Sequence, residues 1–136
     1  MTINPRQLHD ETLHFIRYDF SFSSPSSTVM NAGVNFGSLP AGAVPIRVDV
    51  AVDTAFNNGT NNLISVGYTA TGTDLVNGAS LASQALVTTA APAAAIATAK
   101  QATSKTGTQL YVSTSQTGTA ATTGTCSLII YYVPNI

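Results

Sequence analysis

Apolar and polar side chains alternate along much of this chain, and this alternation predicts β-strands. Between residues 14 and 22 every second side chain is aromatic or aliphatic, or is the imidazole that starts the run. A period of two is typical of a strand with one buried face. We therefore predict a strand here whose inward face is formed by His14, Ile16, Tyr18, Phe20 and Phe22. Pro25, in the serine-rich segment that follows, ends it.

A second alternating run covers residues 44–53. Its predicted inward face consists of Val44, Ile46, Val48, Val50 and Val52, and its outward face of Pro45, Arg47, Asp49, Ala51 and Asp53. The Asn-Asn-Gly sequence at 57–59 predicts a turn. Residues 63–70 alternate again, with Ile64, Val66 and Tyr68 as the expected buried set, so we expect the two strands to form a hairpin. Residues 33–42, which contain glycine and proline, are expected to be a connection.

The segment 74–104 fits no single pattern, whereas the last third of the chain is clear. The many alanines of residues 74–104 favour a helix after Pro92, while Thr88, Thr89, Thr98 and Thr103 favour strands or loops, and both alternatives stay open. Alternation returns around Leu110, and an apolar strand runs from Cys126 to Val133. Short strands separated by Gly, Asn and Pro turns predict an all-β protein, an antiparallel β-sandwich or jelly roll.

The length and the distribution of ionisable residues predict one domain preceded by an arm. A chain of 136 residues fits a single core. Residues 1–12 contain Arg6, His9, Asp10 and Glu11 and precede the first clean strand. We therefore expect an extended N-terminal arm over residues 1–12 and one β-sandwich domain over residues 13–136.

Low charge narrows the possible partners. Charged residues make up 8% of the chain, against about 25% in an average domain, and the net charge is −1. Without a basic cluster we expect no binding to nucleic acid or to an anionic membrane. No apolar run approaches the roughly 20 residues of a membrane span, and the polar start is unlike a signal peptide, so we expect synthesis in the cytoplasm. Weakly charged proteins tend to self-associate, which favours a homo-oligomer.

The acidic residues and the single cysteine give no candidate active site. Asp49 and Asp53 are four strand residues apart, roughly 13 Å, which exceeds the spacing of glycosidase carboxylates. We interpret them, with Arg47, as a solvated row of surface charges. Cys126 begins a strand with no histidine near it in sequence, which predicts a buried, inert thiol.

Other motifs are equally uninformative about chemistry. His9 and His14, even with Asp10 and Glu11, match no zinc-ligand spacing. The glycines of segment 33–37 are not followed by the Lys-Ser/Thr pair of a phosphate loop, and the Asn-Gly-Thr of 58–60 is expected to be a turn rather than a glycan acceptor. We therefore predict no catalytic, cofactor-binding or metal-binding residues, no cofactor, and a protein that is not an enzyme.

Two segments carry a resemblance to a known family. The sequences GSLPAGAVPIRVDVAVDTAFNNGTNN (37–62) and GTAATTGTCSLIIYYVP (118–134) resemble small structural proteins of tailed bacteriophages, in particular jelly-roll head decoration, or cement, proteins. The resemblance implies a virion protein on the capsid exterior that binds the major capsid protein and stabilises the head. It also agrees with self-association as a homodimer or homotrimer.

Two alternatives come from other functional classes. The main one is a receptor- or glycan-binding module of a phage tail fibre or spike, although sugar sites usually use exposed aromatic rings. This chain has no Trp, and most of its Tyr and Phe residues fall at predicted strand positions. A cupin-like metal-dependent hydrolase would need more than the two histidines present.

Overall fold

Eight strands and two short helices account for the ordered elements within residues 13–102 and 107–134, which the computed structural model describes. The elements are β1 (His14–Ser21), α1 (Ser27–Ala32), β2 (Val34–Leu39), β3 (Val44–Thr54), β4 (Asn61–Gly67), β5 (Val76–Ser80), β6 (Ala85–Ala90), α2 (Ala93–Lys100), β7 (Thr108–Thr117) and β8 (Thr125–Val133). The predicted N-terminal arm, residues 1–12, lies outside the described residues.

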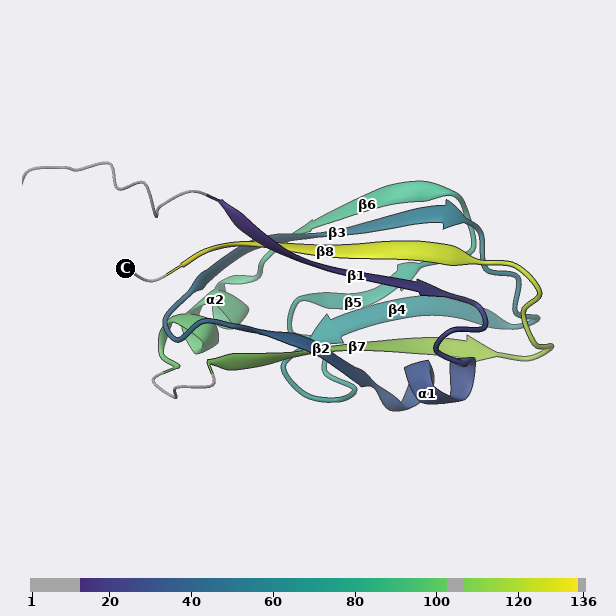
Figure 1. Ribbon diagram of the computed structural model, residues 1–136, viewed down its shortest axis with the longest axis horizontal. Helices are drawn as coiled ribbons and strands as arrows, with labels where there is room; N and C mark the ends of the chain where they lie inside the picture. Colours follow the sequence, from purple (N-terminus) through teal and green to yellow (C-terminus); the bar gives the residue numbers. More distant parts are fainter. Residues whose placement is uncertain (1–12, 103–106, 135–136) are drawn as a thin grey trace, which may run out of the picture.

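The strands form two antiparallel four-stranded sheets packed face to face (Figure 1). One sheet has the order β1-β8-β3-β6 and the other β2-β7-β4-β5. Strand β1 pairs with β8, β2 with β7, β3 with β6 and β4 with β5, and these pairs alternate between the sheets. The chain is thus a long double strand wrapped around a core, which is a jelly roll. The predicted all-β sandwich is confirmed.

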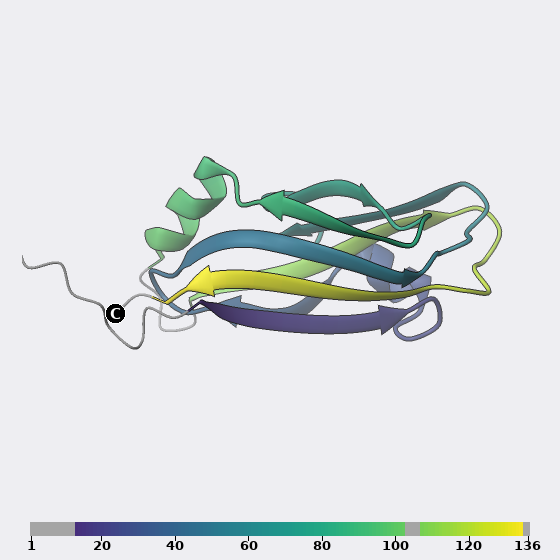
Figure 2. The ribbon, with the colours of Figure 1, turned by 90° about the horizontal axis from the view of Figure 1, so that it is seen from above.

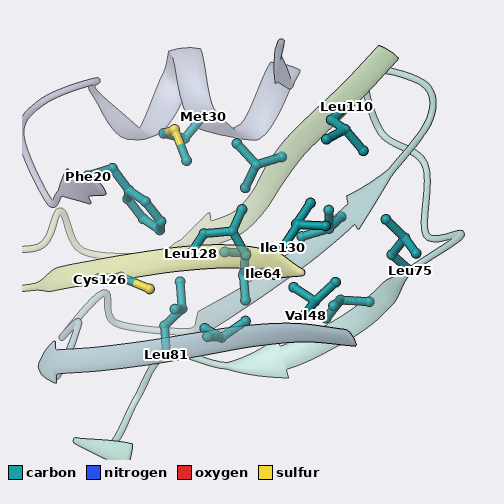
Figure 3. Packing of buried hydrophobic residues seen from close by; sticks show 14 of the residues in the cluster. Phe20, Met30, Val48, Ile64, Leu75, Leu81, Leu110, Cys126, Leu128 and Ile130 are labelled. Atoms are coloured by element: carbon teal, nitrogen blue, oxygen red, sulfur yellow. The ribbon is translucent and has the colours of Figure 1, made fainter. Parts of the chain in front are cut away.

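The core lies between the sheets and is built from the inward positions of the alternating strands (Figure 3). Leu128 and Ile130 of β8 are fully buried, as are the valines 48 and 50 that the alternation of β3 predicts to face inward. On the other sheet Ile64 and Leu110 have no exposed surface. Burying one such side chain contributes about 1.5–3 kcal/mol, so the inward faces hold the two sheets together.

Two helices lie at opposite ends of the sandwich (Figure 1). Helix α1, which the sequence did not predict, begins after Ser26, whose Oγ accepts a hydrogen bond from the N–H of Val29 at 3.5 Å, and it buries Met30. Helix α2 follows Pro92, which occupies the N-cap position. The open question over residues 74–104 is therefore answered by two strands before Pro92 and a helix after it.

Two predictions about strands are wrong. Strands β3 and β4 do not form a hairpin, because they belong to different sheets. The connection between them crosses the end of the sandwich and buries Phe56, which is 2% exposed. The segment 33–42 is not only a connection, since it contains strand β2, whose Leu39 is fully buried.

A bulge corrects the predicted inward face of β3. Its register against β8 shifts between Pro45 and Arg47, which leaves Ile46 as the extra residue. Ile46 is consequently 41% exposed, while Pro45 is buried. Pro45, which was expected on the outward face, lies near the start of β3, an inner strand, and the adjacent bulge is a place where a sheet tolerates proline.

Candidate binding surfaces

The outward side of the sheet β1-β8-β3-β6, here called the charged face, gathers most of the charges of the described residues. Arg17 and Asp19 come from β1, and Arg47 and Asp49 from β3, with Asp53 near the end of the same strand. Elsewhere in the described chain only Asp74 and Lys100 are charged. The pairing of β1 and β3 with the two edges of β8 is what brings these residues onto one surface.

On β1 the charges neutralise each other. The Nε of Arg17 donates a hydrogen bond to Oδ1 of Asp19 at 2.8 Å, and its Nη2 donates to the hydroxyl of Ser127 at 3.2 Å. The hydrogen bond with Asp19 raises the pKa of Arg17, and the same bond lowers the pKa of Asp19. Both side chains are more than half exposed, so the ion pair contributes little to stability.

On β3 the structure corrects the predicted solvated row, because Asp49 is only 7% exposed. Its Oδ1 lies 3.5 Å from Nε of Arg47 and makes no hydrogen bond within the described chain. Arg47 in turn lies over the ring of Tyr131 on β8, with its Cζ 4.3 Å from the ring centre. Asp49 lies on an inner strand, opposite Ile129 of β8 and Thr88 of β6. Asp53 is exposed, as predicted.

The outward side of the sheet β2-β7-β4-β5, here called the neutral face, carries no charged residue among those described. Its positions follow from the register, since they alternate with the buried Ile64, Val66, Leu110 and Val112. They include Asn35, Ser38, Leu63, Ser65, Gln109, Tyr111 and Ser115, together with Ser113, which is only 7% exposed. Part of this surface is fixed internally, because Nδ2 of Asn35 donates a hydrogen bond to Oε1 of Gln109 at 2.8 Å. The face is therefore a neutral, hydroxyl-rich surface with a few apolar groups.

Cys126 lies where the sequence predicted, on β8 with its side chain in the core (Figure 3). Burial raises the pKa of its thiol to about 12, and the charges of Asp53 and Asp19 act in the same direction. The thiol therefore stays protonated at neutral pH, and a protonated thiol is a poor nucleophile.

The remaining sequence candidates are dispersed. His14 was expected on the inward face of the first strand, but it is exposed and its ring lies 5.6 Å from that of Tyr132. Asn58 is buried in the connection between β3 and β4, where Nδ2 of Asn62 donates a hydrogen bond to its carbonyl at 3.0 Å. Gly33, at a φ of 97°, ends helix α1. His9, Asp10 and Glu11 lie outside the described residues.

Neither a metal cluster nor a membrane span is found within residues 13–102 and 107–134. No group of three His, Cys, Asp or Glu side chains in this part is arranged to hold an ion. Neither of its helices has the length and apolarity required to cross a bilayer. What the described structure offers for binding is its two contrasting sheet faces and its strand edges.

Comparison with solved structures places the fold beside phage capsid chains. No protein-family profile and no curated protein matches the sequence. The chain is similar to a chain of the cyanophage Pam1 capsid asymmetric unit, with a TM-score of 0.71 and 12% identity over 99% of this chain and 94% of that one. It is also similar to a chain of the capsid of Ralstonia phage GP4, with a TM-score of 0.57 and 21% identity over 100% and 92%. At these identities the chain shares its β-sandwich fold, over nearly its whole length, with chains of two phage capsids.

Proposed function

We propose that this chain is a non-enzymatic structural protein of a bacteriophage virion, which binds the outer capsid surface and stabilises the head as a decoration, or cement, protein. The observation that carries the proposal is the shared fold with the Pam1 capsid chain, at a TM-score of 0.71 over 99% of this chain and 94% of that one. The decoration role is supported separately by the resemblance of segments 37–62 and 118–134 to jelly-roll cement proteins.

The neutral face supports self-association as a homodimer or homotrimer. Bringing two charged surfaces together requires their ions to be desolvated, which offsets much of the gain from contact. A face built from Ser, Asn, Gln and Tyr avoids this cost and retains groups for hydrogen bonds at the contact. In our proposal the neutral face joins copies of the chain, and the major capsid protein is the other partner.

The N-terminal residues 1–12 are proposed to add a clasp. They contain Arg6, His9, Asp10 and Glu11, four of the thirteen Lys, Arg, Asp, Glu and His side chains of the chain. A segment that orders on its partner loses entropy when it binds, but it reaches across a neighbouring subunit and adds one more attachment. Several weak attachments made together give strong retention on a lattice.

The experiment uses phage heads prepared without this protein. The full chain is expected to co-sediment with these heads at a fixed ratio to the major capsid protein, and to raise the temperature at which they break. A variant lacking residues 1–12 is expected to bind more weakly while keeping its β-sheet circular dichroism. Absence of head binding by the full chain contradicts the proposed function, and equal binding by both forms contradicts the clasp.

One surface feature makes the tail-fibre alternative worth testing in parallel. Phe15 on the charged face is 62% exposed, so its aromatic ring is open to a sugar, while the ring of Tyr131, 6.3 Å away, carries the guanidinium of Arg47. Binding to host cells or to their surface glycans, with no binding to heads, would replace the capsid proposal by a receptor-binding module.

A further inference from the structure

The two sheets have four edge strands, and three of these are irregular or charged. Strand β1 carries the Arg17–Asp19 ion pair. Strand β2 is interrupted by a bulge between Asn35 and Gly37. Strand β5 has an irregular register against β4 and includes Gly78 at a φ of 70°. Charges, bulges and glycine kinks of this kind are the devices by which proteins prevent further strands from adding to a sheet.

The fourth edge, β6, has none of these devices. Its sequence, Ala-Leu-Val-Thr-Thr-Ala, contains no charge, proline or glycine. Its pairing with β3 runs from Ala85 to Ala90 without a shift. Leu86 is 65% exposed on its outward side, the largest exposed fraction among the large hydrophobic side chains of the described chain. Figure 2 shows β6, in green, along the edge of its sheet opposite β1, with helix α2 beyond its end.

Hydrogen-bonding groups of β6 point away from the sheet in a regular row. The N–H of Ala91 donates to the carbonyl of Ile46 at 2.9 Å, which shows that the odd-numbered residues at this end of β6 are the ones that bond to β3. Because bonding alternates along an antiparallel strand, Val87 and Thr89 bond to β3. The N–H and C=O groups of Leu86, Thr88 and Ala90 are therefore directed outward, and no described residue bonds to them.

We propose that β6 is a docking edge, at which an extended segment of the capsid subunit adds a fifth strand to the sheet β1-β8-β3-β6. The inference rests on the proposed function and names the surface that meets the shell. Outward N–H and C=O groups spaced about 6.8 Å apart match only another extended backbone. The side chains of β6 require a neutral segment, with a β-branched or aromatic residue opposite Leu86.

Contact area favours the capsid subunit over a second copy as the occupant. A strand of this length covers roughly 20 Å, and pairing it with another β6 buries a few hundred Å², well below the roughly 1,000 Å² of a stable interface. An edge contact this small is useful where other attachments already hold the two chains together. A lattice of capsid subunits provides that situation, whereas a free pair of molecules does not.

The test removes one outward donor without touching the ladder to β3. Thr88→Pro deletes an N–H that points away from the sheet and places the proline ring where the added strand would lie. Thr88→Val is the matched control, since it changes the side chain and keeps the N–H. Thr88→Pro loses the bond from the Thr88 N–H, and its ring also displaces the added strand from the Thr88 carbonyl. Losing these two bonds predicts head binding weakened about tenfold, whereas Thr88→Val should stay within about twofold of the original.

Hydrogen exchange on the unaltered protein gives a readout that does not depend on the variant folding. In the free protein the amides of Leu86, Thr88 and Ala90 are expected to exchange quickly, and those of Val87 and Thr89 slowly. When the protein is bound to undecorated heads, all five amides are expected to be protected from exchange.

The outcomes separate the two proposals. The docking edge is overturned if the protein binds heads while the amides of residues 86, 88 and 90 still exchange quickly and Thr88→Pro binds as well as the original. The proposed function then still stands. Protection of these amides in concentrated free protein overturns the capsid subunit as occupant in favour of a second copy. No binding to heads by the unaltered protein removes the proposed function itself.

Discussion

Asn31 gives the most direct test of how α1 is attached to the sandwich. Its Oδ1 accepts hydrogen bonds from Oγ1 of Thr114 at 2.7 Å and from the N–H of Gln116 at 3.0 Å. Its Nδ2 donates to the carbonyl of Gln116 at 2.9 Å. Thr114 and Gln116 are each 6% exposed, so water cannot easily replace these bonds. Asn31→Ala deletes all of them, and at about 1 kcal/mol for each bond the expected loss in the free energy of unfolding is about 3 kcal/mol.

The measurement is urea-induced unfolding followed by circular dichroism, with Asn35→Ala as the matched control. Asn35 also uses both ends of its amide, donating to Oε1 of Gln109 at 2.8 Å and accepting from the N–H of Gly37 at 3.1 Å. Because Asn35 is exposed, water takes over these roles, and the expected loss is below about 1 kcal/mol. Equal losses for the two variants would refute the reasoning, since burial would then not decide the cost.

Three further predictions concern single positions. Cys126→Ser should keep head binding while lowering the free energy of unfolding by about 1–3 kcal/mol, because a hydroxyl enters an apolar site; a folded variant that has lost all function would instead indicate thiol chemistry. Gly33→Ala should lower the melting temperature strongly, because a Cβ there would lie 1.8 Å from the carbonyl oxygen of Ala70. Gly37→Ala is the control and should change the melting temperature little, because the atom nearest to its Cβ would be 3.4 Å away. Equal shifts for the two variants would show that the backbone at residue 33 moves to accommodate the Cβ. Light scattering should give a mass above 14.0 kDa that is nearly independent of salt concentration. Leu63 and Leu86 are exposed leucines on opposite sheets, and the mass should fall for Leu63→Glu but not for Leu86→Glu. A monomer at every concentration would contradict self-association.

The sequence predicts individual strands well because alternation is a local property. The inward positions of β7 and most of those of β3 follow from a period of two, which requires no knowledge of the partner strand. Pairing depends on distant parts of the chain. The hairpin prediction failed because Phe56 enters the core and carries the connection from one sheet to the other, and nothing in the Asn-Asn-Gly turn reveals this.

Helix α1 and the buried carboxylate illustrate what sequence patterns miss. The helix has six residues, too short for a 3.6-residue period to be evident, and its tertiary contacts are the burial of Met30 and the bonds of Asn31. Asp49 reads as a surface residue because it alternates with buried valines. It is buried because β3 is an inner strand, where Asp49 lies between Ile129 of β8 and Thr88 of β6. Both residues are far away in the chain and become neighbours only through strand pairing.

The sequence shows that charges are few, but not that they collect on one side. Segregation arises because β1 and β3 flank β8 in the same sheet, so Arg17, Asp19, Arg47 and Asp49 share its outward face. The strands of the other sheet contain no Asp, Glu, Lys, Arg or His, and their outward residues are mostly Ser, Asn and Gln. A charge-poor composition thus becomes a molecule with two unlike faces, a property that appears only once the jelly-roll strand order is known.

The two proposed attachment surfaces, the neutral face and the β6 edge, lead to a final prediction about head binding. If copies join through the neutral face and each copy offers a β6 edge, an oligomer meets the shell at several points, and its retention depends on the product of weak contacts. Leu63 lies on the neutral face, in the sheet opposite β6, so it has no proposed contact with the shell. Leu63→Glu should nevertheless weaken head binding by about a hundredfold, the low end of what multivalency provides. Fusing the variant to an unrelated trimeric coiled coil should restore the binding. Co-sedimentation with undecorated heads measures both steps. Unchanged binding by a demonstrably monomeric Leu63→Glu would mean that each copy holds the shell on its own, and it would separate self-association from stabilisation of the head.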